Sequence, residues 1–139
     1  MAYDTNNPFA RIVRGELPAF RVLDDEHVLA FMDIMPQADG HTLVVPKIAG
    51  ENLLDTPPDA LQAMILATQR IARAVDAVFS PAGIVVTQFN RPAAGQTVFH
   101  LHFHVIPVYQ AGEWRVHGRD KADFAVLEAQ AARLRAALS

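Results

Sequence analysis

The chain has 139 residues, of which 51% are hydrophobic and 19% charged, with a formal net charge of −3 and no cysteine. This fits one globular domain and provides no dense basic patch for duplex nucleic acid, while disulfides and thiolate metal sites are excluded. No apolar run is long enough for a signal peptide or a membrane span, so we expect a soluble cytoplasmic protein with neither nucleic acid nor membrane as a partner.

The first half of the chain predicts one short helix followed by three strands. Asn7 and Pro8 are typical of an N-cap and a first helical residue, and Gly15 is typical of a helix end. Short apolar runs then alternate with turn residues, which favours an antiparallel meander. The predicted helix and strands cover residues 8–14, 20–24, 28–34 and 41–46.

The second half predicts a long helix, two strands and a last helix. After Pro57 and Pro58, apolar residues recur at helical spacing up to Phe79. Two strands are expected at 83–90 and 97–107, and an alanine-rich helix from about residue 120. Five strands and two main helices in one domain make an α+β fold.

Histidines occupy alternate positions of the segment TVFHLHFHVIP, which runs from Thr97 to Pro107. On a strand, His100, His102 and His104 would project from one face, opposite an apolar face. An exposed polar face is the plainer alternative, but such faces usually carry Thr, Lys, Glu, Ser or Arg. A metal site is a further alternative. The outer imidazoles would be anchored roughly 13 Å apart, so all three could bind one ion only on a bent strand, and other ligands would be needed.

The segment HLHFHVI resembles the pattern His-φ-His-φ-His-φ-φ of the histidine triad (HIT) superfamily, where φ is hydrophobic. Three longer segments resemble family segments in the expected order: FARIVRGELPA from Phe9, VLAFMDIMPQADGHTLVVPK from Val28 and GQTVFHLHFHVIP from Gly95. The resemblance covers about residues 7–108. It implies a HIT-like fold, with a HIT domain over 1–110, and 111–139 as a tail and helix of the same domain.

The resemblance also implies an activity and an assembly. Family members are nucleotide hydrolases and transferases that act on an α-phosphate, and they are usually homodimers whose sheets join into one. By this resemblance His102 is the nucleophile and forms a nucleotidyl-histidine, while His104 hydrogen-bonds the phosphate oxygens. His100 orients its neighbour and His41 extends the network. A neutral imidazole has one bare nitrogen, and clustered histidines disfavour protonation, so the chemistry agrees with these roles.

Eight more positions match substrate-binding positions of the family. Asp33 resembles a carboxylate that binds ribose hydroxyls, although it could also only initiate a turn. Apolar positions that match those around a purine base are Phe9, Phe31 and Ile34, for which core packing is the alternative. Positions that match those near the phosphates are Asn90, Gly95, Gln96 and Thr97.

This sequence lacks the zinc ligands of many bacterial family members, and it has a tryptophan that only some members share. Many bacterial relatives carry a Cys-x-x-Cys pair that, with histidines, holds structural zinc, but Asn7 and Ala10 occupy those positions here. The histidine often found after the Pro-Lys pair is also missing after Lys47. We therefore expect no metal and no cofactor. Trp114 matches a tryptophan that some relatives place near the partner's active site, with ordinary packing as the alternative.

Several functions remain open at this stage. The substrates of the two hydrolase branches are purine nucleoside phosphoramidates and dinucleoside polyphosphates, and the sequence does not separate them. The transferase branch replaces the third histidine, whereas this chain retains His104. A nucleotide-binding interaction protein with incidental turnover is the alternative from another class. A metal-binding protein is a third class, which the strand geometry and the absent cysteines weaken.

Overall fold

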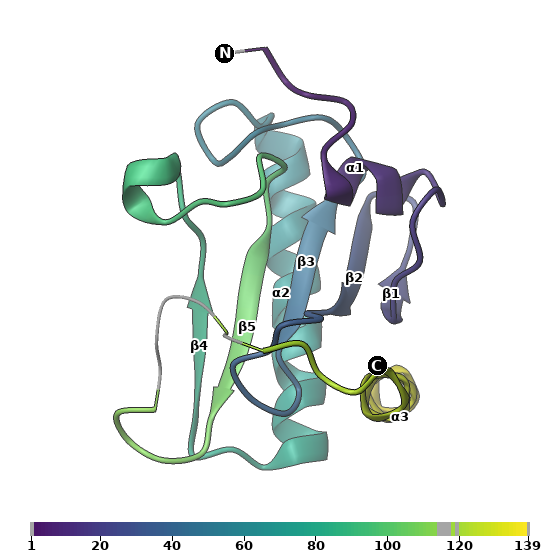
Figure 1. Cartoon of the computed structure of the whole chain (residues 1–139), viewed down its shortest axis with the longest axis vertical. Coiled ribbons are helices and arrows are strands. Elements are labelled where there is room, and N and C mark those ends of the chain that lie inside the picture. Colours follow the sequence, from purple (N-terminus) through teal and green to yellow (C-terminus); the bar gives the residue numbers. More distant parts are fainter. Residues whose placement is uncertain (1, 114–117, 119, 139) are drawn as a thin grey trace.

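Five strands form one antiparallel sheet in the order β1-β2-β3-β5-β4 (Figure 1). The computed structural model describes residues 2–113, 118 and 120–138. The strands are β1 (Arg21–Asp24), β2 (Val28–Met32), β3 (Thr42–Pro46), β4 (Gly83–Thr87) and β5 (Phe103–Val108). The expected α+β fold with a five-stranded antiparallel sheet is confirmed.

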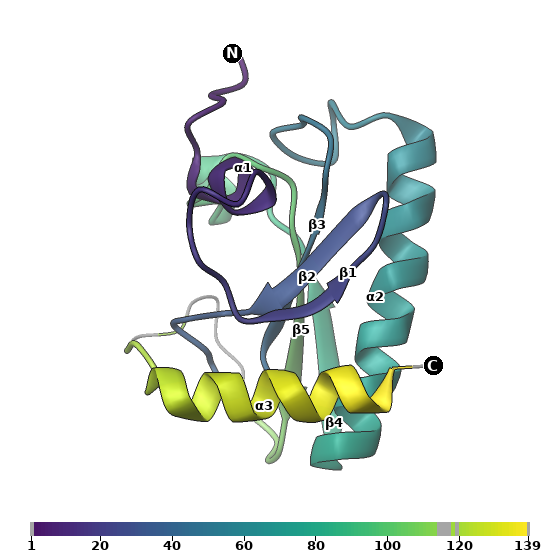
Figure 2. The same cartoon turned by 90° about the vertical axis from the view of Figure 1, so that its right-hand side faces the viewer.

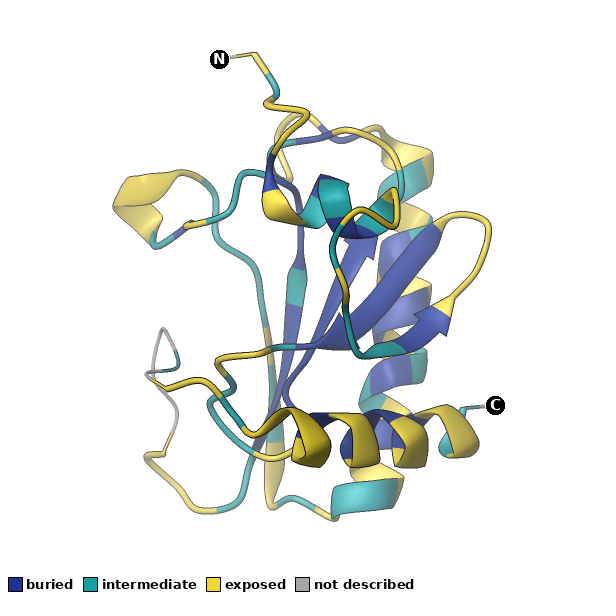
Figure 3. Ribbon diagram, turned by 45° about the vertical axis from the view of Figure 1, so that its right-hand side comes forward, coloured by how far each residue is buried: buried dark blue, intermediate teal, exposed yellow. Residues whose placement is uncertain are grey.

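Helices cover both faces of the central strands. They are α1 (Pro8–Val13), α2 (Pro58–Phe79) and α3 (Phe124–Ala137), and Pro92–Ala94 forms the short 3-10 turn η1. In Figure 2 the sheet is seen edge-on, with α1 on one side of it and α2 on the other. This arrangement explains why β2 and β3 are buried along their whole length (Figure 3).

The side chains of β2 and β3 alternate between two apolar clusters. Ala30 and Val44 belong to the larger cluster, which packs α2 and α3 against the sheet. Phe31 and Leu43 belong to a smaller cluster on the other face, under Ile12 of α1. The second face is therefore partly core, and a cavity lies over the rest of it.

Local sequence signals explain where the helices begin and what they bury. The Asn7 side chain accepts a hydrogen bond from the Ala10 N–H at 2.9 Å, as an N-cap does. Within α2, Met64, Ile71 and Val75 are fully buried, at the helical spacing read from the sequence. No helix in the described ranges is long and apolar enough to cross a membrane.

The predicted histidine strand over 97–107 is wrong in its first half. β5 begins only at Phe103, and residues 98–102 form bends and irregular backbone. Continuing the β3–β5 register from Val44↔Phe103 would place residue 101 opposite Pro46, which has no N–H to donate. The Leu101 N–H donates instead to the Gly50 carbonyl at 2.9 Å. Leu101 still belongs to the core cluster, so the expected alternation of faces persists beyond the strand.

Other predicted boundaries differ by a few residues. The strands expected at 28–34 and 83–90 end at Met32 and Thr87, and the last helix begins at Phe124 rather than near residue 120. Asp33 explains the first of these differences, because its side chain accepts the Met35 N–H at 2.8 Å and turns the chain.

Candidate active site

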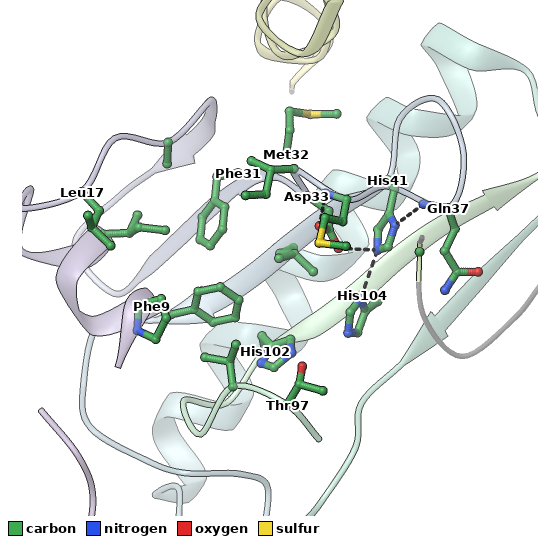
Figure 4. A pocket seen from close by; sticks show the side chains of 18 of the residues that line it. Phe9, Leu17, Phe31, Met32, Asp33, Gln37, His41, Thr97, His102 and His104 are labelled. Atoms are coloured by element: carbon green, nitrogen blue, oxygen red, sulfur yellow. Dashed lines mark hydrogen bonds and ion pairs between the residues drawn. The ribbon is translucent and has the colours of Figure 1, made fainter. Parts of the chain in front are cut away.

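A cavity of about 640 Å³ opens on the α1 side of the sheet. One end is apolar, between Phe9 and Leu17 of the N-terminal segment and Phe31 of β2 (Figure 4). The other end is polar, where His102 and His104 meet Thr97. The predicted site residues that line the cavity are Phe9, Phe31, Asp33, Ile34, His41, Gly95, Thr97, His102 and His104.

The hydrogen bond of His102 determines which ring nitrogen is bare. Its Nδ1 lies 2.7 Å from the His100 carbonyl oxygen, and because a carbonyl only accepts, Nδ1 carries the proton. The lone pair is then on Nε2. Burial lowers the pKa of His102 and nearby His100 and His41 lower it further, while the carbonyl bond and Asp33 oppose them. His102 is therefore a neutral imidazole, and the Phe9 ring packs edge-on against it at 4.9 Å.

A second set of hydrogen bonds determines which ring nitrogen carries the proton in His41 and in His104. The Gln37 backbone N–H donates to His41 Nδ1 at 3.0 Å, so neutral His41 carries its proton on Nε2. This Nε2 lies 3.0 Å from His104 Nδ1 and donates to it. His104 consequently carries its own proton on Nε2. Burial lowers the pKa of His41, which keeps the ring neutral, while Asp33 opposes this effect.

Asp33 makes two contacts with its two carboxylate oxygens. Oδ1 accepts from Met35 in the turn described above, and Oδ2 lies 3.5 Å from His41 Nε2. The side chain is partly exposed and lines the cavity. Asp33 thus initiates a turn, which was the alternative to ribose binding, and its Oδ2 still faces the histidines.

Asp33, His41 and His104 form a group whose ligand atoms lie within 4.8 Å of one another. Such a set could hold a divalent ion by spacing alone. However, His41 Nε2 could bind a metal only if its proton moved to Nδ1, where the Gln37 N–H already donates. The donor set therefore favours a hydrogen-bonded network that shares protons over a metal centre.

Two predicted phosphate-site residues lie outside the cavity and hold its loop. Gln96 is buried, and its Nε2 donates to the carbonyls of Glu51 at 2.6 Å and Val98 at 3.0 Å. Asn90 accepts from the Leu53 N–H at 3.0 Å. Both side chains therefore brace the segment that carries Gly95 and Thr97.

His100 also lies outside the cavity, fully buried. Its Nε2 is 2.8 Å from the Pro46 carbonyl oxygen and its Nδ1 is 2.6 Å from the Tyr3 hydroxyl. Sequence reasoning missed Tyr3, Gln37 and Leu17. The Gln37 contact is made by the backbone, so no side-chain pattern could have revealed it. Trp114 lies outside the described residues.

The chain belongs to the HIT domain family, because the family model matches residues 14–111. A HIT-like protein from Bartonella henselae, described as involved in cell-cycle regulation and solved with an unknown ligand, is 48% identical with a TM-score of 0.92; the match covers 99% of this chain and 100% of that one. A zinc-bound histidine triad protein from Mycobacterium smegmatis is 36% identical with a TM-score of 0.83, over 96% and 93% of the two chains.

A relative with a named activity is the adenylylsulfatase HINT3 of Arabidopsis thaliana. It is 34% identical over 99 residues, which are 71% of this chain and 50% of that protein. The family therefore includes a hydrolase, and the fold and family expected from the histidine pattern are confirmed.

Proposed function

We propose that this protein is a nucleotide hydrolase that cleaves at the α-phosphate through a nucleotidyl-histidine at His102. The observation that carries the proposal is the orientation of this ring. Its Nδ1–H is held by the His100 carbonyl, and its bare Nε2 belongs to a neutral, buried imidazole that lines the cavity. A neutral imidazole fixed in one tautomer is a nucleophile at neutral pH.

In the first step the Nε2 lone pair of His102 forms a bond to phosphorus as the bond to the leaving nitrogen or oxygen breaks. The leaving group takes up a proton, for which the Thr97 hydroxyl at the cavity wall is a candidate donor. In the second step water attacks phosphorus from the side that the leaving group vacated, its proton restores the Thr97 hydroxyl, and His102 departs as a neutral ring.

His104 supplies the electrostatic part of this mechanism. Because its Nδ1 accepts from His41, His104 carries its proton on Nε2, and this N–H would donate to the non-bridging oxygens, where negative charge develops. The hydrogen bond from the Gln37 N–H to His41 Nδ1 fixes the tautomers of both rings before the substrate binds.

The apolar end of the cavity suits a purine base. Phe9 and Phe31 contact each other edge-on at 5.4 Å and line the cavity with Ile34. Asp33, between this end and the histidines, would accept hydrogen bonds from ribose hydroxyls. The resulting order of base, sugar and phosphate agrees with the positions of the family that these residues match.

A panel of three substrates would distinguish the hydrolase activities that fit the site. They are an adenosine phosphoramidate, a diadenosine polyphosphate and adenylyl sulfate, the last because a relative is named an adenylylsulfatase. All three place the base, ribose and α-phosphate identically and differ only in the leaving group. Relative kcat/KM values across this panel assign the substrate class.

Rapid mixing and mass spectrometry test the nucleophile. After mixing with each substrate, we expect an adenylyl adduct on His102 and none in His102→Ala. His27→Ala is a matched control, because this histidine is exposed and lies outside the cavity. An adduct on another residue would refute the mechanism. Retained biological activity of His102→Ala would favour the alternative, a nucleotide-binding interaction protein.

We also propose that the protein is a homodimer joined along β4. This strand is at the edge of the sheet, and Val86 on it is half-exposed beside Ile65 and Leu66 of α2, whose side chains are also exposed. A second copy would cover this apolar face and pair the edge strand. A cytoplasmic location remains a prediction from composition.

A further inference from the structure

The His100 ring is buried behind the cavity, and both of its nitrogens are engaged. Its Nε2 faces the Pro46 carbonyl, which only accepts, so Nε2 carries the proton. Nδ1 of the neutral ring must then accept, and its neighbour at 2.6 Å is the Tyr3 hydroxyl. Tyr3 therefore donates to His100, and burial supports this assignment because it lowers the pKa of His100.

The backbone of His100 connects this ring to the nucleophile. Its carbonyl oxygen is the acceptor for His102 Nδ1 at 2.7 Å. Both residues precede β5, so no ladder of strand hydrogen bonds holds this carbonyl in place. The planar peptide group that carries this carbonyl is held on its other side by the Leu101 N–H, which donates to the Gly50 carbonyl at 2.9 Å. The anchored His100 side chain is thus a second restraint on the direction of the carbonyl.

The N-terminal segment that carries Tyr3 is tied to the fold. The Asp4 carbonyl accepts from the Asn7 side chain at 2.8 Å, and the Thr5 carbonyl accepts from Arg14 at 2.7 Å. Asn7 in turn caps α1, whose Phe9 packs against the His102 ring. One segment of chain therefore contacts both the support of the nucleophile and the nucleophile itself.

We propose that Tyr3 is a positioning residue that acts through His100 to aim the Nε2 of His102 at phosphorus. This inference depends on the proposed function for its kinetic effect. Without the phenol, the buried Nδ1 loses its donor, and the ring is free to move its proton to Nδ1 or to turn. Nε2 would then face the Pro46 carbonyl without a proton, and the His100 carbonyl would lose one of the two restraints on its direction, keeping only the Leu101–Gly50 bond.

Tyr3→Phe tests the proposal because it removes only the hydroxyl. We expect kcat to fall about tenfold, the effect of leaving one buried acceptor unpaired, with KM changed by less than about twofold. Long-range ¹H–¹⁵N NMR of the free protein should show a pyridine-type Nδ1 and a pyrrole-type Nε2 for His100 in the wild type. In Tyr3→Phe this signature should be lost.

Tyr109→Phe is the control, since the Tyr109 hydroxyl also donates to one acceptor, the exposed Asp39 carbonyl at 2.7 Å, away from His100. An unchanged His100 signature or an unchanged kcat in Tyr3→Phe would overturn the proposal, as would an equal loss of kcat in Tyr109→Phe. A wild type that hydrolyses no nucleotide would refute the proposed function, while the NMR spectra would still decide whether Tyr3 fixes the His100 ring.

Discussion

Mild acid should destabilise this protein strongly, because three buried imidazoles are neutral in the fold and free to protonate when it opens. Burial lowers the pKa of His41, His100 and His102 below the ordinary value of 6.5. Between pH 6.5 and the lower pKa values of the folded state, the unfolded chain binds more protons than the native one. The free energy of unfolding therefore rises with pH in this window and falls on acidification.

The size of this effect follows from the number of groups. A histidine that stays neutral in the fold loses about 1 kcal/mol of stability between pH 6.5 and 5.5, from 1.36 kcal/mol per pH unit for each full proton. The three residues together amount to at most about 3 kcal/mol, against a typical total of about 5–15 kcal/mol. Carboxylates such as Asp24, whose pKa is lowered by its bond to Lys47, exchange protons at lower pH.

Urea unfolding at a series of pH values between about 5 and 7 measures this slope. Near pH 5.5 we expect a net uptake of more than one proton per molecule unfolded, with about three as the upper limit set by these histidines. His100→Asn should reduce the uptake, whatever its effect on stability at pH 7. An uptake below about one proton in the wild type would refute the assignment of neutral, buried histidines.

Three further predictions concern activity, backbone strain and assembly. The acid limb of kcat/KM should have its midpoint below pH 6.5, because burial lowers the pKa of His102 and, in the proposed mechanism, only its neutral form attacks; a midpoint at or above 6.5 would contradict this. Arg91→Gly should stabilise the protein by about 1 kcal/mol in urea unfolding. Arg91 has φ 78° and ψ 157°, a backbone region that costs residues other than glycine about 1–3 kcal/mol, so a lower stability of the variant would contradict the strain. Leu66→Glu should give a monomer by light scattering that stays folded by circular dichroism, and a persistent dimer would exclude this face.

Much of the fold could be predicted because its signals are local. The apolar spacing of α2 and the Asn7 cap of α1 each act over a few residues, and both are present in the structure. The start of β5 was misjudged because the apolar alternation continues through 97–102. What ends the ladder is Pro46 on a neighbouring strand, which is distant in sequence.

The site was predictable to the extent that its chemistry resides in side-chain identity. His102, His104 and Asp33 do lie around one cavity, but Gln96 does not, although its type and position matched the phosphate end. A buried glutamine can serve a ligand or the backbone equally well, and the choice depends on the Glu51 and Val98 carbonyls that the fold brings near. The proton order of the histidines depends likewise on the main chain at residue 37.

The cavity also determines how an anionic ligand would reach it. Among the described residues that line it, Asp33 is charged, and neither lysine nor arginine is present. With a formal net charge of −3 over the chain, long-range attraction would not accelerate the encounter with a phosphate ester. Association should therefore proceed at an unsteered rate that depends little on ionic strength, and the lifetime of the complex, set by the apolar end and the imidazoles, would decide which ligands are retained.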